Sequence, residues 1–272
     1  MVLTEDNYYS PEANLEYMSE SQFKQFAGTY GRRGCEYRAL KMLTGRWNEK
    51  VTDAMLIGSY VDAYVDGPEQ LQRFQQSHPL MFKSDGMLYA KYRIAEIIID
   101  RIQRDEFFMD ALGGEHQVIM TGELFGAKWK IKMDAYHPHK AIVDLKTVQR
   151  VHDPDDPTHL ATEYVRDLGR LDWVRYWDYT LQGAVYQEIV RQNTGERLPF
   201  YLAAVSKEEF PDIDVIRINQ KELDDAMAKV EINMPRINAL RNGEELPYRC
   251  EGCDCCRQSK VLKTFTDFEV AV

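Results

Sequence analysis

The stretch that decides the fold is Asp134-Ala-Tyr-His-Pro-His-Lys-Ala-Ile-Val-Asp144-Leu-Lys146, because it has the pattern of a β-hairpin. Residues alternate between apolar and polar on both sides of a Pro-His-Lys turn, which predicts two antiparallel strands. A turn centred on His139 would place Asp134 directly opposite Asp144. Two carboxylates on directly opposed residues repel each other unless a cation lies between them.

This hairpin has the composition of a metal site. Carboxylate oxygens a few ångströms apart are the ligands that hard divalent cations prefer. Lys146 follows Asp144 by two residues and would hold a positive charge on the same face, where it can orient or deprotonate a water molecule. The pattern leaves one alternative open, an edge hairpin whose charged residues face solvent.

A second polar pattern lies farther along the chain. Apolar residues over 173–189 have the spacing of an amphipathic helix. Asp178, Gln182 and Tyr186 are four residues apart and form a stripe along the edge of its apolar face. Such a stripe suits contacts with phosphate or bases, and it is also found at ordinary boundaries between buried and exposed faces.

The order Asp134, Asp144-x-Lys146, Gln182-x-x-x-Tyr186 resembles the PD-(D/E)XK nuclease superfamily, specifically its RecB-like branch. The resemblance implies an α/β fold: a restriction-endonuclease-like mixed central sheet flanked by helices, with a helical N-terminal part and a cysteine-rich C-terminal tail. It assigns catalytic roles to five residues: Asp134, Asp144, Lys146, Gln182 and Tyr186. Mg²⁺ or Mn²⁺ would bind the two aspartates and the carbonyl of Leu145, while Lys146 positions the attacking water.

The segments 18–26 and 57–67 and the terminal cysteines extend this resemblance to phage and prophage exonucleases related to exodeoxyribonuclease VIII, the RecE-like enzymes. It implies a Mg-dependent deoxyribonuclease that recesses duplex DNA ends in phage-type recombination or repair. A single-strand annealing protein is the implied partner, and a homo-oligomer is the implied assembly. The rival interpretations are a non-catalytic DNA-binding or assembly module that retains the fold, and a cysteine-metal adaptor.

The chain departs from the family at one position. The usual Gly-x-x-x-His helix, whose histidine binds metal, stands here as Gly58-Ser-Tyr-Val-Asp62. Asp62 is therefore either a replacement oxygen ligand, suited to magnesium or manganese, or a surface residue of a helix. Glu123, which precedes the hairpin, is a further candidate for the edge of the site.

Cysteine placement is the second independent signal. Four of the five cysteines fall in Cys250-Glu-Gly-Cys253-Asp-Cys255-Cys256, and the spacing of Cys250, Cys253 and Cys256 suits metal ligands. Cys35 is the expected fourth thiolate. The resemblance favours a [4Fe-4S] cluster over Zn²⁺, and reduced thiols without metal remain the alternative. Cys255 is either a spare thiol or a substitute ligand.

Composition indicates a globular protein. The 272 residues carry 34 basic and 44 acidic side chains, a net charge of −10, whereas nucleic-acid-binding surfaces are usually basic. We therefore expect a basic groove on an acidic body. Without a signal peptide or an apolar run of about 20 residues, we expect a soluble, cytoplasmic protein of bacterial or phage origin.

The pattern along the chain predicts one domain, residues 1–272, built from three successive regions. Helices are expected first, over residues 1–112; their ranges are 31–44, 52–66, 86–104 and 105–112. The core, 113–219, holds the strands: 115–122, 125–136, 140–148, 200–206 and 213–218. A polar loop of about a dozen residues is expected from Asp153. The last region, 220–272, combines a helix over 220–241, interrupted or kinked at Pro235, with the cysteines.

Overall fold

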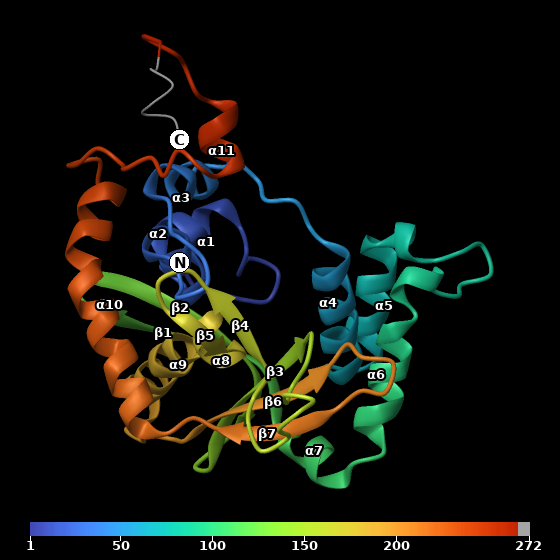
Figure 1. Ribbon diagram of the computed structural model, residues 1–272. Helices are drawn as coiled ribbons and strands as arrows, with labels where there is room; N and C mark the ends of the chain where they lie inside the picture. Colours follow the sequence, from blue (N-terminus) through green and yellow to red (C-terminus); the bar gives the residue numbers. More distant parts are fainter. Residues whose placement is uncertain (266–272) are drawn as a thin grey trace.

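The computed structural model describes residues 1–265, and a mixed five-stranded sheet lies at its centre (Figure 1). The strand order is β1-β2-β3-β6-β7, antiparallel except for the parallel pair β3 and β6. The strands are β1 (Glu115–Leu124), β2 (Ala127–His137), β3 (Ala141–Val148), β6 (Phe200–Ser206) and β7 (Ile213–Arg217). All five predicted strands are present within about two residues of the expected bounds.

Helices cover both faces of this sheet and its upper end. The N-terminal helices are α1 (Pro11–Glu16), α2 (Glu20–Ala27) and α3 (Glu36–Leu43). A helical lobe follows, with α4 (Asp53–Val65), α5 (Pro68–Ser77), α6 (Ile94–Gln103) and α7 (Glu106–Ala111). The remainder comprises α8 (Trp173–Tyr176), α9 (Tyr179–Thr194), α10 (Gln220–Arg241) and α11 (Asp254–Gln258). The predicted mixed sheet flanked by helices is confirmed; residues 266–272 of the predicted last region lie outside the described residues.

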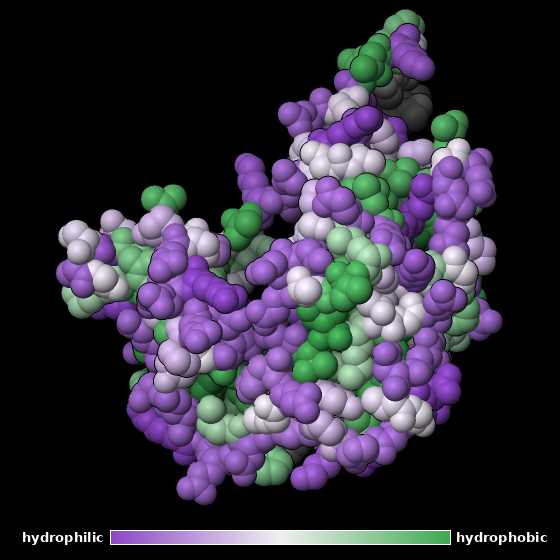
Figure 2. All heavy atoms as spheres, turned by 180° about the vertical axis from the view of Figure 1, so that it is seen from behind, coloured by the Kyte–Doolittle hydropathy of each residue, from purple (hydrophilic) through white to green (hydrophobic). Residues whose placement is uncertain are grey.

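Two apolar cores lie on opposite faces of the sheet, as the period of two in a strand requires. In β6, Phe200 and Leu202 belong to the core shared with α9 and α10. Their neighbours Ala203 and Val205 belong to the core shared with α4 to α7. Figure 1 shows these two helical layers on either side of the sheet. The surface seen from behind is largely hydrophilic and is hollowed between the helical lobe and the taller body (Figure 2).

Four helix predictions differ from the structure, mostly at glycine or proline. The predicted helix 31–44 begins only at Glu36, since Gly34 lies against the backbone of the preceding segment; a Cβ there would sit 2.2 Å from Phe26 O. The Gly67-Pro68 break also starts a helix, α5, with Pro68 in its first turn. The predicted helix 86–104 forms as a short 3₁₀ turn, 90–92, followed by α6. Helix α10 continues through Pro235.

The region between β3 and β6 contains two further corrections. The expected loop after Asp153 leads into a small hairpin, β4 (Thr162–Val165) and β5 (Gly169–Asp172). The predicted helix over 173–189 is broken at Asp178, which has a left-handed backbone (φ 56°, ψ 49°) and caps α9. Asp178 is buried and pairs with Lys229 of α10, so it is a structural residue.

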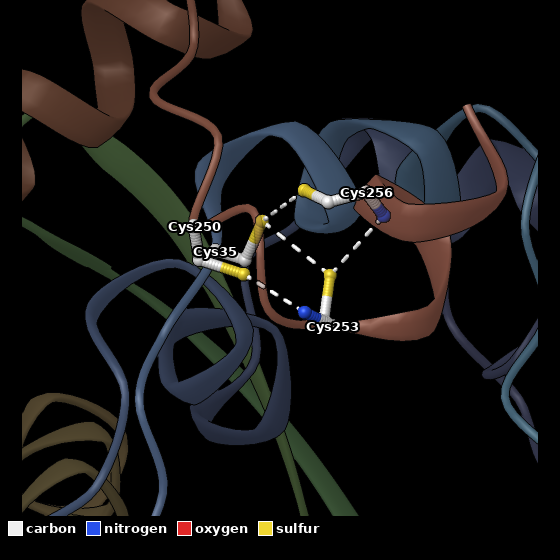
Figure 3. Close-up of side chains that lie close together, drawn as sticks. All are labelled: Cys35, Cys250, Cys253 and Cys256. Carbon is white, nitrogen blue, oxygen red and sulfur yellow. Dashed lines mark hydrogen bonds between the residues drawn. The ribbon is translucent and has the colours of Figure 1, made fainter. Parts of the chain in front are cut away.

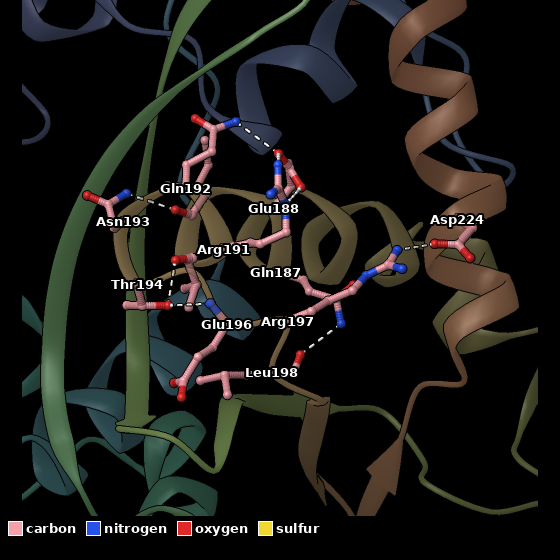
Figure 4. Close-up of polar contacts among 12 residues, drawn as sticks. Gln187, Glu188, Arg191, Gln192, Asn193, Thr194, Glu196, Arg197, Leu198 and Asp224 are labelled. Carbon is pink, nitrogen blue, oxygen red and sulfur yellow. Dashed lines mark hydrogen bonds and ion pairs between the residues drawn. The ribbon is translucent and has the colours of Figure 1, made fainter.

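The C-terminal end of α9 is tied to its surroundings by polar contacts (Figure 4). The Gln187 side chain donates to the carbonyl of Leu198 at 2.8 Å, just before β6. Arg197, in the same connection between α9 and β6, forms an ion pair with Asp224 of α10. These contacts join α9, the start of β6 and α10, and so fix the helix that carries Gln182 and Tyr186.

Gly183 tests this packing. A Cβ at Gly183 would lie 2.4 Å from Phe200 Cδ1 and 2.9 Å from Leu223 Cδ2, so Gly183→Val must push α9 away from the sheet. We expect the free energy of unfolding, measured in urea, to fall by about 1–3 kcal/mol. Arg191→Val places the same side chain on the exposed side of α9 and is expected to change it by less than about 0.5 kcal/mol. Equal losses in both variants would contradict the close-packing argument.

Candidate functional site

The candidate site lies where β2 and β3 separate. The two strands pair from His137 and Ala141, next to the turn at His139, as far as Ala135 and Val143. At the next position the ladder stops, and the Asp134 carboxylate accepts a hydrogen bond from the backbone N–H of Leu145 at 2.9 Å. The carbonyl of a strand residue points to the same side as its N–H. The Leu145 carbonyl therefore faces the same gap as Asp134.

Asp144 is the buried centre of the site. It is 2% exposed, lies in β3 and forms an ion pair with Lys146. Gln182 of α9 donates to the other oxygen of Asp144 at 2.5 Å. A carboxylate buried to this degree is costly unless its charge and lone pairs are satisfied. These two partners offset part of that cost, and Oδ2 has no hydrogen-bond partner among the described residues beyond the Lys146 ion pair. The predicted Asp-x-Lys and Gln motifs thus meet at one carboxylate.

The regular pleat ends at Asp134. Met133 belongs to the core next to α9, whereas Ala135 belongs to the core next to α4, although alternation places both on one face. Across the β1–β2 pair, Gln117 has a left-handed backbone (φ 54°). A left-handed non-glycine residue costs on the order of 1 kcal/mol and is concentrated at functional sites. This local change of facing turns Asp134 toward β3.

Asp62 reaches the site from α4. A Cβ on Gly58 would lie 2.8 Å from Thr147 Oγ1, so glycine permits the close approach of α4 to β3. Asp62 and Lys146 line one cleft of about 1020 Å³. Of the two interpretations left open by the sequence, the position of Asp62 favours a site residue over a surface residue.

The electrostatics of the carboxylates show that the site lacks positive charge. Burial raises the pKa of Asp62 to about 7, with a further contribution from Asp144 and an opposing one from Lys146. Burial, then Asp144 and Asp62, raise the pKa of Asp134 well above its usual range. Burial alone would lower the pKa of Lys146, but Asp144, Tyr179 and Asp134 together raise it above its usual value. Lys146 is therefore a protonated cation, not a base, in this state.

Tyr186 and Glu123 occupy different positions relative to the site. The Tyr186 hydroxyl lies one turn after Gln182 and donates to the carbonyl of Lys132 at 2.9 Å, so Tyr186 braces β2 beside the site. Glu123 is exposed and pairs with Lys128 in the β1–β2 ladder. Since Lys128 precedes Asp134 by six residues, Glu123 lies on the order of 20 Å away along the strand. The structure does not bring Glu123 to the site.

Sequence reasoning overlooked Tyr179 and the mixed charge of the cleft. The Lys146 ammonium lies 4.7 Å from the centroid of the Tyr179 ring. In the sequence, Tyr179 is marked only by its position one turn before Gln182. The charged residues that line the cleft are of both signs: Arg32, Lys146, Arg150, Arg170, Lys207, Asp62, Asp153, Asp155 and Glu163. The cleft is thus less basic than predicted.

The chemistry of these residues fits a divalent cation. The donors are carboxylates with raised pKa values and a free strand carbonyl, and Gln182 Oε1 is buried with no hydrogen-bond partner among the described residues. In residues 1–265, however, the cysteines are the only His, Cys, Asp or Glu group of three or more with ligand atoms within 4.8 Å of one another. The carboxylates are more widely spaced, so an ion that contacts Asp62, Asp134 and Asp144 requires them to approach.

The four predicted cysteines meet in a second cluster (Figure 3). Cys35 precedes α3, and Cys250, Cys253 and Cys256 surround the start of α11; their sulfur atoms all lie within 4.8 Å. Cys35 Sγ lies 3.6 Å from Cys256 Sγ and 3.9 Å from Cys253 Sγ. The cluster therefore joins the N-terminal helices to the tail. Cys255 is buried outside this group.

The thiols of the cluster differ in how readily they ionise. Burial would raise the pKa of Cys250, but the backbone N–H groups of Cys253 and Gly252 lower it to about 6. Burial raises the pKa of Cys253, and it raises the pKa of Cys256 to about 12. A bound cation would have to stabilise these two thiolates. Four sulfur ligands about 2.3 Å from one tetrahedral ion would lie about 3.8 Å apart. Two of the six sulfur separations, 3.6 and 3.9 Å, are close to this value, and all six lie within 4.8 Å. The four cysteines could therefore bind a metal.

Asp62 gives a pH-dependent test of the metal-free site. Its folded pKa of about 7 exceeds the ordinary 3.8, so its ionisation costs stability as the pH rises through this interval. In EDTA, we expect Asp62→Asn to raise the free energy of unfolding by about 2–4 kcal/mol at pH 8 and to have little effect at pH 4. Asp53→Asn, at the exposed start of α4, is the control and is expected not to stabilise. Destabilisation by Asp62→Asn at pH 8 would contradict the assignment.

Comparisons with known proteins agree with this geometry. Residues 19–259 match the family model described as "PDDEXK-like domain of unknown function (DUF3799)". A crystal structure of a protein from Eubacterium rectale, named "Putative exonuclease", superposes with a TM-score of 0.93 at 52% identity, covering 100% of this chain and 98% of that one. No curated protein matches the sequence. No described helix is long and apolar enough to cross a membrane. The chain belongs to the PDDEXK-like family DUF3799, within the PD-(D/E)XK nuclease superfamily.

Proposed function

We propose that this protein is a divalent-metal-dependent DNA exonuclease that hydrolyses phosphodiester bonds. The observation that carries the proposal is the assembly at Asp144, where Lys146 of the same strand and Gln182 of α9 both contact one buried carboxylate. Membership of the nuclease superfamily and likeness to the Eubacterium rectale protein support it. Both cores share one sheet, which supports the proposal that the chain acts as one domain.

Each residue has a role that follows from its contacts. Asp134, Asp144 and the Leu145 carbonyl, with Asp62 from α4, would hold Mg²⁺ or Mn²⁺. A bound ion supplies Lewis-acid polarisation of the phosphoryl oxygen and lowers the pKa of water. Gln182 orients Asp144 through its amide N–H.

Lys146 acts as a fixed positive charge. Because its pKa is raised by Asp144, Tyr179 and Asp134, it donates hydrogen bonds and stabilises negative charge that develops on the phosphoryl group. The Tyr179 ring limits where its ammonium can lie. We therefore propose that Lys146 positions the attacking water and does not remove its proton.

Two finer features rest on the resemblance to RecE-like enzymes alone. These are the recession of duplex ends during phage-type recombination or repair, and cooperation with a single-strand annealing protein. The mixed charge of the cleft adds a consequence: its basic side chains can neutralise only a few phosphates, so DNA binding is expected to be weak and to fall with salt along a shallow slope.

A cleavage assay with magnesium tests the proposed chemistry. Wild-type protein is expected to degrade linear duplex DNA and to leave covalently closed circular DNA intact. Lys146→Ala is expected to lower the rate by about 100-fold or more, since it removes the cation beside the reacting phosphate. Lys140→Ala, in the exposed turn between β2 and β3, is the matched control and should retain the wild-type rate. Absence of cleavage, or equal cleavage by Lys146→Ala, would favour a non-catalytic DNA-binding module.

For the cysteine cluster, we propose a structural metal that joins Cys35 to the tail. The spacing of the sulfur atoms supports one tetrahedral Zn²⁺, whereas the resemblance to RecB-like nucleases supports a [4Fe-4S] cluster. A metal in this position would stabilise the fold by joining residues more than 200 positions apart.

Metal analysis of anaerobically purified protein distinguishes these two occupants. We expect one zinc per chain and no absorbance near 400 nm; a brown protein with four irons would overturn the zinc assignment. Cys256→Ser is expected to lose the metal and to lower the melting temperature. Cys255→Ser, which changes the neighbouring thiol outside the group, is the control and should keep the metal.

A further inference from the structure

A second pocket, of about 460 Å³, lies beside the candidate site. Its walls are the N-terminal segment, the first turn of α2, one side of α3 and strand β2. Figure 1 shows α1 and α2 close to β2, and Met18 forms a β-bridge with Trp129 of that strand. The pocket has the volume of a small-molecule site and is separate from the large cleft.

The pocket contains two cations without a carboxylate partner. Lys130 is 1% exposed, and its ammonium donates to the carbonyl of Tyr8 and to Asn14 Oδ1 at 2.7 Å. The ammonium also lies 4.6 Å from the centroid of the Tyr8 ring, so its contacts within residues 1–265 are two neutral oxygens and one aromatic face. Lys132 likewise makes no ion pair within residues 1–265. The acidic residue in the wall, Glu20, pairs with Lys24.

A buried ammonium without an anionic partner is costly, and the Tyr8 ring beneath Lys130 offsets this cost only in part. Burial lowers the pKa of Lys130 to about 8, yet Lys130 stays largely protonated at neutral pH. The two neutral oxygens on Lys130 could be held equally well by an uncharged donor, so tethering the N-terminal segment does not account for the charge. An anion in the pocket would neutralise the charge of the Lys130 ammonium.

The remaining lining suits a nucleotide. The Lys132 ammonium lies 5.8 Å from the Tyr8 ring centroid and 5.1 Å from the Tyr9 ring centroid, so two aromatic rings border the cations. Gln22 Oε1 is buried without a hydrogen-bond partner in the described chain and can accept from a base or a sugar. Phosphate pairs with lysine, and bases stack on tyrosine. Both ammonium groups lie over the buried Tyr8 ring, so the exposed Tyr9 ring is the one that a base could reach.

The pocket adjoins the carboxylates. Tyr186 lines it and donates to the backbone of Lys132, while Gln182, one turn earlier in α9, contacts Asp144. Lys132 precedes Asp134 by two residues, on the order of 7 Å along β2. A strand cut at the carboxylates could therefore place its neighbouring phosphate at Lys132.

We propose that this pocket binds the terminal phosphate-bearing nucleotide of the strand being cut. The inference rests on the proposed nuclease function and adds a substrate-end subsite to it. The cleft of about 1020 Å³ would hold the body of the strand, and the smaller pocket would hold its end. The balance of charge supports this division: the pocket has two lysines and one acidic residue, Glu20, which pairs with Lys24 outside the lining, whereas the cleft has basic and acidic residues in nearly equal number.

Calorimetry in EDTA tests the pocket without catalysis, with deoxyadenosine 5′-monophosphate and deoxyadenosine as probes. We expect the monophosphate to bind at least tenfold more tightly than the nucleoside. Lys130→Met and Lys132→Met are expected to weaken it by about tenfold or more. Lys128→Met, on the same strand but paired with Glu16 outside the pocket, is the control and should bind within about twofold of wild type.

The outcomes separate the two proposals. If Lys130→Met fails to fold, as judged by circular dichroism, the affinity of Lys132→Met decides whether the pocket binds the nucleotide, because Lys132 is only partly buried. The proposal that the pocket binds a nucleotide would be overturned by any of three results: unchanged affinity in Lys132→Met, equal binding of the nucleoside, or an equal loss in Lys128→Met. Metal-dependent cleavage without nucleotide binding would overturn this proposal and leave the nuclease proposal standing. Nucleotide binding lost in Lys132→Met, with no cleavage by wild type, would overturn the nuclease proposal and keep the pocket as an anion site.

Discussion

The separation of β2 from β3 beyond Ala135 and Val143 is the constraint on which the site depends. A continued ladder would use the backbone N–H of Leu145 for pairing, and no gap would exist for oxygen ligands. Instead, the Asp134 carboxylate takes that hydrogen bond, and the Leu145 carbonyl faces the same opening. The parallel pairing of β3 with β6 keeps β3 in place while its other edge stays free.

The protein keeps this opening charged at a cost in stability. The carboxylates that face it have raised pKa values because burial and mutual repulsion disfavour their ionised forms. Lys146 and Gln182 contact Asp144 directly, and Lys146 opposes the rise at Asp62 and Asp134 only in part. The remaining negative charge is what a divalent cation would neutralise. Stability and the proposed function are therefore opposed at this site.

The cysteine cluster connects the two ends of the described chain. The helices α1 to α3 pack against the upper end of the sheet, and the tail after α10 returns to the same region. Four thiols contributed by both segments close on one another there, so a single ion would fix the N-terminal helices relative to α10. The N-terminal segment also carries Tyr8 and Gln22, which form walls of the pocket beside the carboxylates.

The sequence by itself determined the five strands, the Asp-x-Lys and Gln-x-x-x-Tyr pattern and the four cysteines, because period-two alternation and ligand spacing are local properties. Tertiary structure alone decided the rest. The turn of Asp134 toward β3 depends on a break in the pleat that alternation cannot predict, and the buried Asp178 at the helix break pairs with a lysine 51 residues away in the chain. Asp62 lines the cleft beside Lys146 because Gly58 lets α4 approach β3, and Glu123 is remote because β1 and β2 are long. Contacts between residues far apart in the chain carry no periodic signal, and these contacts decide which carboxylates meet.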